Sequence, residues 1–387
     1  MTARRVALVA GGGTGGHLVP ALAVARALAE GYGPGSVELV GARRGLDAEI
    51  LAGEGMPVTL LPGRGIARRL DARSTLANVG AVAGLVAASA AALVIVARRR
   101  PAVVVAMGGY ACVPTALAAA VLGVPVVLVN TDAVPGAANR LVGRFARAAA
   151  VAFEGTPLRR AVVTGAPVRP ALVAATRPDA EARRSARHAL GLPADRVVVA
   201  AVGGSLGARH LNEAVVGLAT LWRARRDVAL YHVVGRRDAS WAAAAAPGLP
   251  ADGLVYVQVP YEERMALFYQ AADVVVSRSG ANTVAELAVV GVPALLVPLP
   301  GAPGDHQRAN AGVLERAGGA VVVADAECTP ARLAAEIDAL VSGPGRLEAM
   351  RAAAASVGRP DAVSAVAALA RAHARRPHRG ARAAHAG

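Results

Sequence analysis

The chain has 387 residues, of which 55% are hydrophobic and only 3% aromatic, so it is long enough for two α/β domains with cores built mainly from Val, Leu and Ala. Lysine and arginine outnumber aspartate and glutamate by 42 to 27, and the formal charge of +15 favours anionic partners such as nucleotides, pyrophosphates or acidic lipid surfaces without identifying one. The two cysteines, Cys112 and Cys328, are too few for a disulfide framework, which excludes the disulfide-rich secreted class.

The first expected strand, residues 6–10, is followed by a glycine-rich turn over residues 11–16 and by a helix over residues 20–29. The apolar run before Gly11 is too short for the core of a signal peptide, so we expect no export signal. Because glycine has no side chain, a ligand can approach the backbone of this turn, and the helix N-terminus offers N–H groups to an anion or a polar sugar. No acidic residue ends a second strand at the distance that the dinucleotide-binding fingerprint requires. His17, at the end of the turn, is either a general base or a hydrogen-bonded structural residue.

Short runs rich in valine alternate with alanine-rich helical stretches along the chain, which is typical of strands buried on both faces of a parallel sheet. We therefore predict an α/β fold built from βαβ units. A loop-like stretch near residues 162–178 separates two such series and predicts a first domain over residues 1–168, a second over 169–370 and a basic disordered tail over 371–387. The expected strands lie at residues 6–10, 37–40, 58–61, 103–107, 126–129, 149–153, 197–202, 229–234, 254–257, 274–277, 294–297 and 320–323.

Residues 75–97 carry no charge and are followed by three arginines, so their length alone would suffice for a membrane span. Alanine, glycine and polar residues dilute this segment, and a strand-like run follows it after a short turn. We expect a buried or membrane-facing helix rather than a true span. Together with basic residues nearby, it would form a docking surface for anionic lipid; these residues are Arg64, Arg68, Arg69 and Arg73.

Two further strand-to-helix turns are rich in glycine and polar residues. Residues 203–209 add the hydroxyl of Ser205 and a guanidinium to their glycines, a composition suited to phosphate, with close packing as the alternative. Residues 277–286 repeat this setting and end at Glu286, whose carboxylate could accept both ribose hydroxyls or simply stabilise the helix N-terminus. A polar cluster over residues 304–310 follows the next strand. Polar turns at the carboxyl ends of neighbouring parallel strands predict one crevice.

The sequence predicts neither a metal nor a cofactor. No Cys/His spacing suits a metal site, and no Asp-X-Asp pair is present to hold a divalent cation on a diphosphate. A Walker loop is absent as well, which argues against a nucleoside triphosphatase. The turns together favour a transferase that takes a sugar from a nucleotide diphosphate, and we expect no nucleic-acid partner.

These motifs resemble those of the MurG family, and the resemblance covers nearly the whole chain. GGGTGGHLVPALAVARAL is similar to the family's first glycine-rich loop, GGYACVPTALAA to its second and TGAPVRP to its interdomain segment. GGSLGARHLN and SGANTVAELAVVGVPALLVPLPGAPGDHQRANA are similar to its donor-site signatures. The last of these is long and highly specific.

The resemblance implies a GT-B fold, in which two Rossmann-like domains face a cleft. The N-terminal domain would receive an undecaprenyl-pyrophosphate-linked acceptor, and the C-terminal domain would bind UDP-N-acetylglucosamine. The implied reaction belongs to peptidoglycan synthesis, inverts the anomeric carbon and needs no metal. It would take place on the cytoplasmic face of the cell membrane, with the protein bound peripherally to an anionic membrane surface.

By motif position, His17 is the expected general base, and Thr14, Gly15 and Gly16 would approach the donor sugar and diphosphate. Arg169 and Ser205 would serve the diphosphate or nearby donor groups. Residues 281–286 would bind the nucleotide, with Glu286 on the ribose, and Gln307 would bind the sugar with His306 beside it. The complete set of expected substrate-binding residues is Thr14, Gly15, Gly16, Asp132, Arg169, Ser205, Ala281, Asn282, Thr283, Val284, Ala285, Glu286, His306 and Gln307.

The chain departs from the family pattern on the expected sugar and acceptor side. Residues 129–132 read Val-Asn-Thr-Asp where the family usually has His-Glu-Gln-Asn, so Asp132 replaces an Asn that usually contacts the sugar. Leu206 stands where Gln is usual, and Ala166 where Asn is usual. Three hypotheses follow: the cell-wall transferase, a paralogue acting on another lipid or natural-product acceptor, and a catalytically silent membrane-associated binding protein. A sugar-nucleotide epimerase of similar fold is a lesser alternative.

Overall fold

The computed structural model describes residues 6–12, 15–43, 55–62, 72–204 and 207–375. The chain forms two compact units, each of which is described by itself. The first comprises Met1–Thr131, Pro135–Pro167 and Asp361–Gly387, and the second comprises Asp132–Val134 and Val168–Pro360. Each unit is built around one parallel sheet, so the predicted α/β fold is confirmed.

The first unit contains sheet A, whose described strands are all parallel and run in the order β3-β2-β1-β4-β5-β6-β7. Because β1 and β4 are neighbours at the centre, the chain leaves this centre in both directions, and the carboxyl ends of these two strands flank the switch point where such sheets bind ligands. The strands are β1 (Ala7–Gly12), β2 (Val37–Ala42), β3 (Val58–Leu61), β4 (Val103–Gly109), β5 (Val126–Asn130), β6 (Ala148–Val151) and β7 (Ala161–Val163).

Helices cover both faces of sheet A. Successive strand residues point to opposite faces, and because both sets of side chains are apolar, both faces need a covering layer. Ala7 and Val9 of β1 are buried with α1 (Gly15–Tyr32) and α15 (Ala362–His373). Leu8 and Ala10 point the other way and are buried with α3 (Ala72–Arg99) and α4 (Cys112–Val121), next to α5 (Ala137–Gly143). The two-sided burial explains why the strands read as continuous apolar runs.

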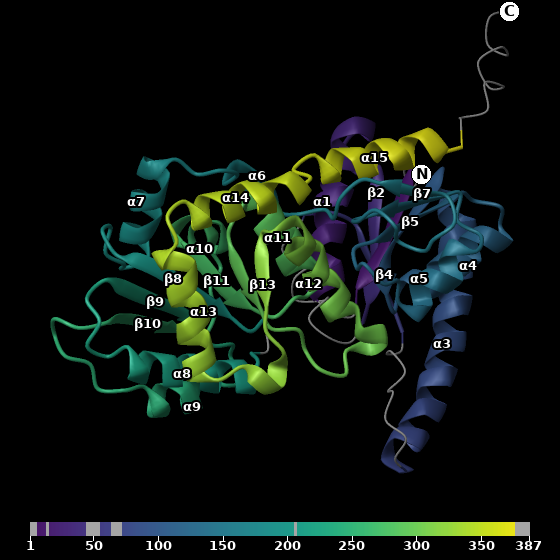
Figure 1. Ribbon diagram of the computed structural model, residues 1–387. Helices are drawn as coiled ribbons and strands as arrows, with labels where there is room; N and C mark the ends of the chain where they lie inside the picture. The colour runs from purple at the N-terminus through teal and green to yellow at the C-terminus, as the bar shows by residue number, and fades with distance from the viewer. Residues whose placement is uncertain (1–5, 13–14, 44–54, 63–71, 205–206, 376–387) are drawn as a thin grey trace, which may run out of the picture. The chain divides into compact units, whose positions relative to one another are not determined.

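The last helix, α15, packs against the first unit rather than the second. Val366, Ala367 and Ala370 are buried with α1, and Figure 1 shows α15 in yellow beside the N-terminal elements of this unit. The sequence assigned this helix to a domain that ends at residue 370, followed by a tail. In the structure the helix continues to His373, and the backbone amide of Arg375 donates to the carbonyl of Ala102 over 2.9 Å. Composition does not reveal this return, because alanine packs equally well on either unit. The remaining tail, residues 376–387, lies outside the described residues.

The second unit contains sheet B, whose described strands are parallel and run in the order β10-β9-β8-β11-β12-β13. Its switch point lies between β8 and β11. The strands are β8 (Val197–Val202), β9 (Val228–Val233), β10 (Val255–Val259), β11 (Val274–Ser277), β12 (Ala294–Leu296) and β13 (Ala320–Val322).

The helices α8 and α13 cover one face of sheet B and share a buried cluster with its strands. On the remaining surface, α10 packs against α7, and α11 packs against α12 and α14. The helices of this unit are α6 (Pro170–Ala174), α7 (Ala180–Ala189), α8 (Arg209–Leu221), α9 (Ala239–Ala245), α10 (Met265–Ala271), α11 (Ala281–Val290), α12 (His306–Ala317), α13 (Pro330–Ser342) and α14 (Arg346–Val357), with short turns η1 (Pro303–Asp305) and η2 (Asp325–Glu327).

Each expected strand is present, and those at residues 58–61, 197–202 and 274–277 have the predicted bounds. The sequence missed β7, because Ala161–Val163 is an exposed edge strand of three residues inside a stretch that reads as loop. The expected helix over residues 75–97 is present as α3. None of the helices that the structure describes, α3 included, is long and apolar enough to cross a membrane.

Candidate functional site

The first glycine-rich turn lies at the carboxyl end of β1, beside the switch point of sheet A. Gly11 and Gly12 end the strand, and α1 begins at Gly15, so Gly15, Gly16 and His17 form its first turn. The helix starts earlier than the expected Pro20, and its unpaired N–H groups lie closer to the strand end than the sequence indicated. Thr14 lies outside the described residues, as does the side chain of His17.

One glycine near this turn is required by the fold rather than by a ligand. Gly109, at the end of β4, has φ +77° and is paired in register with Gly12 of β1. A Cβ at Gly109 would collide with the carbonyl oxygen of Gly12. The close approach of β1 and β4 therefore accounts for glycine at position 109, which leaves the glycines of the first turn itself as candidates for ligand contact.

The second glycine-rich turn lies between β8 and α8, and two of its glycines are also structural. A Cβ on Gly203 would lie 2.7 Å from the amide of Ala208, and one on Gly207 would lie 2.6 Å from the carbonyl of Val234. Gly204, with φ +96°, has open space where its Cβ would be. Ser205 lies outside the described residues. The packing alternative thus explains part of this turn.

The guanidinium of Arg209, which begins α8, already has partners in the structure. It lies 3.3 Å from the buried carboxylate of Asp238 and stacks over the Trp241 ring at 4.2 Å. Asp238 also accepts from the amide of Asn212 on the same helix at 3.0 Å. These contacts fix the start of α8. Arg209 therefore helps to position the glycine-rich turn, and its guanidinium is already paired rather than free to bind phosphate.

The third turn leads from β11 into α11 and carries most of the expected nucleotide-binding residues. Gly280 precedes the helix in an extended conformation, and its carbonyl accepts from the amide of Val284 at 3.0 Å. The side chain of Val284 is fully buried and that of Ala285 nearly so. The residues left to present polar groups are therefore those of the first turn, Ala281 to Thr283, whose N–H groups precede the first helical hydrogen bond.

Glu286 is the centre of a polar cluster on the same helix. Its Oε2 accepts from the Tyr269 hydroxyl of α10 at 2.9 Å, and its Oε1 lies 3.4 Å from a guanidinium nitrogen of Arg169. The carboxylate side chain is 13% exposed and that of Arg169 is 35% exposed. The structure thus brings two expected site residues together and adds Tyr269, for which the sequence carries no signal beyond a tyrosine in an apolar helix.

Burial dominates the electrostatics of this cluster. It raises the pKa of Glu286, and the opposing effects of the Arg169 charge and of the hydrogen bonds from Tyr269 and Arg169 are smaller. The pKa of Tyr269 is raised well above its usual value, first by burial and then by the Glu286 charge, so the phenol stays a hydrogen-bond donor. A carboxylate with a raised pKa and unused lone pairs is a strong acceptor for hydroxyl groups.

The loop after β12 is joined to the third turn by hydrogen bonds. Gln307, near the start of α12, accepts from the Leu299 amide through Oε1 at 3.0 Å, and its carbonyl accepts from the Ser279 hydroxyl at 2.8 Å. His306 uses Nδ1 toward the carbonyl of Pro303 at 2.9 Å. Gln307 therefore shapes the loop, and His306 is held by the turn η1.

Asp132 belongs to the second unit and has a partner on α12. Its Oδ1 accepts from Nδ2 of Asn310 at 2.9 Å, while Oδ1 of Asn310 accepts from the Ala133 amide at 2.8 Å. Asn310 is fully buried and also contacts the carbonyl of Ser279. Asp132, Asn310 and the third turn thus form one network, in which Asn310 fixes the position of the residue that departs from the family pattern.

A second ion-paired cluster at this edge of sheet B was not expected from the sequence. Arg278, directly after β11, lies 2.5 Å from Asp325, which also contacts His210 of α8 at 3.2 Å. Burial raises the pKa of Asp325, but the hydrogen bonds and charges of Arg278 and His210 together outweigh it and lower this pKa. The cluster ties the turns after β8, β11 and β13 together at their carboxyl ends. Within the described ranges no group of His, Cys, Asp and Glu is arranged to hold a metal ion.

Comparisons with known proteins agree with this arrangement. The chain matches the glycosyltransferase family 28 N-terminal domain over residues 7–151 and the C-terminal domain over residues 198–366. A protein from Clavibacter michiganensis subsp. michiganensis is 42% identical over 377 residues, which cover 97% of this chain and 98% of that protein. A protein from Nocardioides sp. is 40% identical over 350 residues, covering 90% and 93%. Both are named UDP-N-acetylglucosamine–N-acetylmuramyl-(pentapeptide) pyrophosphoryl-undecaprenol N-acetylglucosamine transferase.

Solved structures match the same architecture. The crystal structure of Acinetobacter baumannii MurG has a TM-score of 0.75 at 28% identity and covers 95% of this chain and 99% of its own. A UDP-GlcNAc 2-epimerase from Neisseria meningitidis, bound to UDP-GlcNAc, has a TM-score of 0.63 at 12% identity, with 94% and 99% covered. The second likeness is one of fold alone.

Proposed function

Because the chain belongs to the MurG family of N-acetylglucosamine transferases, we propose that the carboxyl edge of sheet B binds UDP-N-acetylglucosamine and that the sugar passes to a lipid-linked acceptor. The chain is a glycosyltransferase of the GT-B architecture, with one Rossmann-like sheet in each unit. The acceptor is the undecaprenyl-pyrophosphoryl-muramoyl-pentapeptide intermediate that the names of the relatives describe. The protein thereby serves peptidoglycan synthesis.

The Glu286 cluster is the observation that carries the proposal. Glu286 is held by Tyr269 and Arg169 on a helix whose N-terminus follows the central strand β11. A ribose can donate both hydroxyls to the carboxylate while the diphosphate lies against the N–H groups of the first turn, where the helix dipole favours negative charge. If Glu286 and Arg169 formed only a structural salt bridge, that salt bridge would need neither the hydrogen bond from Tyr269 nor a helix that starts at the switch point of the sheet.

The reaction is an inverting displacement. A hydroxyl oxygen of the acceptor forms a bond to the anomeric carbon as the bond from that carbon to the UDP oxygen breaks, and UDP leaves with the electron pair. The imidazole of His17 accepts the hydroxyl proton. The helix N-termini after β8 and β11 stabilise the diphosphate as it leaves, which is the role that a divalent cation has in transferases with an Asp-X-Asp pair.

The first unit carries an apolar face suited to a membrane surface. On α3, Val86, Leu93 and Val94 are 65%, 41% and 48% exposed, and Val121 of α4 is 77% exposed. The spacing of the α3 residues places them on one side of the helix, next to arginines at its end. We therefore expect peripheral binding at the cytoplasmic face of the membrane. The expected basic residues Arg64, Arg68 and Arg69 lie outside the described residues.

Membrane docking can be measured by sedimentation with vesicles. Replacing Val94 by Asp should reduce binding to vesicles that contain phosphatidylglycerol, because burying a charge among acyl chains is costly, while UDP affinity stays unchanged. Val162→Asp, on the exposed strand β7, is a control for added charge on the same unit. Equal vesicle binding by the Val94 variant and the wild type would remove α3 from the docking face.

Calorimetry with UDP tests the donor half of the proposal. The wild type should bind UDP. A dissociation constant of about 1 mM corresponds to only about 4 kcal/mol of binding free energy, so the absence of binding at about millimolar UDP would contradict the proposal.

Asp132 favours one second candidate, a paralogue with another acceptor. Its carboxylate, held by Asn310, brings a negative charge to a position where an uncharged amide is usual for the family. Assaying transfer by the wild type and by Asp132→Asn with several acceptors separates the two. The paralogue is supported only if the wild type prefers an acceptor other than the peptidoglycan lipid and the Asn variant shifts that preference.

A further inference from the structure

The second unit contains a large cavity at the edge of sheet B opposite to the nucleotide turns. Its volume is about 900 Å³, within the range of small-molecule sites. It is lined by α7, by the residue before β11, by the end of α11 and by α14. Since β11 starts at Val274 and ends at Ser277, the cavity lies next to its amino end, whereas the turn that leads into α11 starts at its carboxyl end. The residues that line the cavity do not include Glu286, Tyr269 or Arg169, so the two sites share no lining residue.

The cavity is lined by five arginines but only two acidic residues, Asp273 and Glu348. Three of the arginines converge on Asp273. Arg187 lies 2.7 Å from its Oδ2, Arg351 lies 3.0 Å from its Oδ1, and Arg183 contacts Oδ1 as well. The Val198 amide donates to Oδ2 at 2.8 Å. The Asp273 carboxylate is therefore fully used, and its one negative charge cannot balance the three guanidinium groups around it.

The charges of these arginines oppose one another. Burial lowers the pKa of Arg351 most, the charge of Arg183 lowers it further, and Asp273 only partly offsets both. Burial also lowers the pKa of Arg187, and the charge of Arg183 adds to this effect, although here the opposing effect of Asp273 is larger than that of Arg183, unlike at Arg351. Glu348, which is 83% exposed, reaches Arg351 at 3.6 Å and is too solvated to neutralise the group. An added anion in the cavity would relieve this repulsion.

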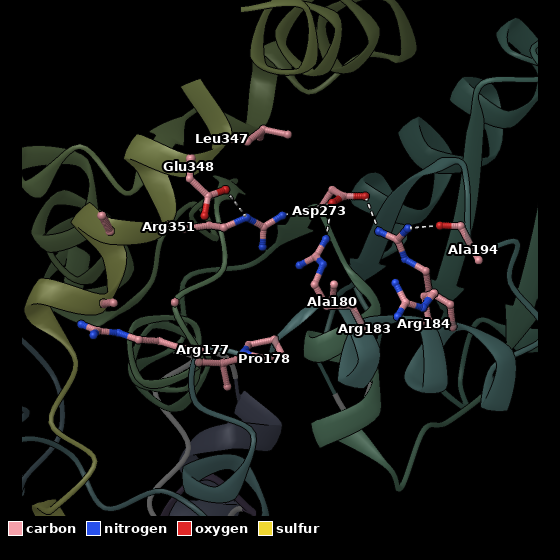
Figure 2. Close-up of a pocket in the computed structure, with 15 residues that line it drawn as sticks. Arg177, Pro178, Ala180, Arg183, Arg184, Ala194, Asp273, Leu347, Glu348 and Arg351 are labelled. Carbon is pink, nitrogen blue, oxygen red and sulfur yellow. Dashed lines mark hydrogen bonds and ion pairs between the residues drawn. The ribbon is translucent and has the colours of Figure 1, made fainter. Parts of the chain in front are cut away.

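The remaining two arginines stand at the rim. Arg177 has φ +49°, and its backbone amide donates to the Val290 carbonyl at 3.2 Å. This hydrogen bond holds the backbone of Arg177 at the rim, from which its side chain is exposed. Arg184 is 56% exposed and pairs with Glu181, also exposed. Figure 2 shows Glu348, Arg351 and Asp273 along one side of the cavity and Arg177 with Pro178 along the other. Guanidinium groups thus line the cavity on both sides.

We propose that this cavity is a binding site for a phosphate-bearing anion, separate from the nucleotide site. Guanidinium forks match the oxygen geometry of phosphate and pyrophosphate, and several of them in one partly enclosed cavity give both charge and direction. A purely structural role for the cluster would be met by Asp273 with Arg183 and Arg187, which join α7 to the start of β11. Arg351 and Arg177 exceed that need.

The test is a calorimetric titration of the whole chain with inorganic pyrophosphate while saturating UDP occupies the nucleotide site. Pyrophosphate should still bind. Arg351→Gln and Arg177→Gln should each weaken it by about tenfold, the effect of losing one charge-assisted hydrogen bond. Arg226→Gln is the control, because Arg226 is an exposed, ion-paired arginine of the same unit outside the cavity. Arg177 is exposed, so its replacement tests binding even if Arg351→Gln disturbs folding.

Absence of pyrophosphate binding in the presence of UDP, or binding that both cavity variants leave unchanged, would overturn the proposal. A vesicle arm identifies the source of the phosphate. If the site takes a lipid headgroup, both variants should lose binding to phosphatidic acid vesicles beyond the loss seen with Arg226→Gln. If it takes a free phosphate compound, vesicle binding should stay equal while pyrophosphate binding falls.

Discussion

The two units use the same arrangement of strand, glycine-rich turn and helix at the switch point of a parallel sheet, but they place different side chains on it. In the first unit α1 begins with Gly15, Gly16 and His17, a turn with an imidazole and no acid. In the second unit, α11 carries Glu286 in contact with Tyr269 and Arg169. The shared backbone provides N–H groups for a polar ligand in both units. On our proposal, the side chains of the first turn serve the chemical step and those of the second serve nucleotide binding.

This difference leads to a rule that can be broken. Changes at the turn of the first unit should lower turnover and leave nucleotide affinity unchanged. Changes at the Glu286 cluster should instead weaken nucleotide binding and leave turnover at saturating donor nearly unchanged. The rule holds because only interactions that strengthen in the transition state affect the chemical step.

The largest effect is expected for His17→Ala. Loss of a general base should lower kcat by about 10²–10⁴-fold, with the dissociation constant of UDP unchanged. Steady-state transfer kinetics and calorimetry measure the two quantities. His373→Ala, on α15 of the same unit, is the matched control. Wild-type turnover in the His17 variant would reassign this residue to a structural role.

Glu286→Ala should weaken UDP binding by roughly 100-fold, because two hydrogen bonds from ribose hydroxyls to a charged acceptor are lost. At saturating donor, kcat should change much less. Glu263→Ala removes an exposed carboxylate of the same unit and should leave UDP binding as in the wild type. If Glu286→Ala instead lowered kcat at unchanged affinity, the division between the units would fail.

The pH dependence of UDP affinity sharpens the same point. Since the pKa of Glu286 is raised and ribose needs the carboxylate form, affinity should fall as the pH drops through that pKa, by up to about tenfold per pH unit. Phosphate groups of UDP titrate as well, so the wild type is compared with Glu286→Gln in the same buffers. The Gln variant should lack the additional slope. Parallel curves for the two proteins would mean that Glu286 does not titrate against nucleotide.

The smallest effect is expected for Tyr269→Phe. Removing the hydroxyl that orients Glu286 should weaken UDP binding by about 2- to 10-fold, the usual worth of one neutral hydrogen bond. Tyr261→Phe, at an exposed tyrosine, is the control and should bind UDP as the wild type does. A loss as large as that of Glu286→Ala would show that Tyr269 contacts the nucleotide itself.

Much of the fold could be read from the sequence because buried parallel strands have a simple signature. Runs such as residues 197–202 and 274–277 are apolar throughout, and their bounds agree with β8 and β11. The edge strand β7 carries no such signature, since its residues are exposed. The return of α15 to the first unit depends on packing against α1, which no local pattern encodes.

The candidate site was predictable where glycines and polar residues cluster along the chain. Glu286 stands at a fixed distance from a glycine turn, and Asp132 stands out as a departure from the family pattern. Tyr269 and the partnership of Asn310 with Asp132 depend on contacts between distant segments. The arginines of the cavity come from residues 177–187 and 351, so only the fold brings them together.

Transfer of labelled N-acetylglucosamine to a short-chain analogue of the peptidoglycan lipid precursor tests the central claim most directly. The wild type should transfer the sugar from UDP-N-acetylglucosamine in preference to other UDP-sugars, and His17→Ala should bind UDP but transfer almost nothing. No transfer by the wild type, or transfer by His17→Ala at the wild-type rate, would contradict the account.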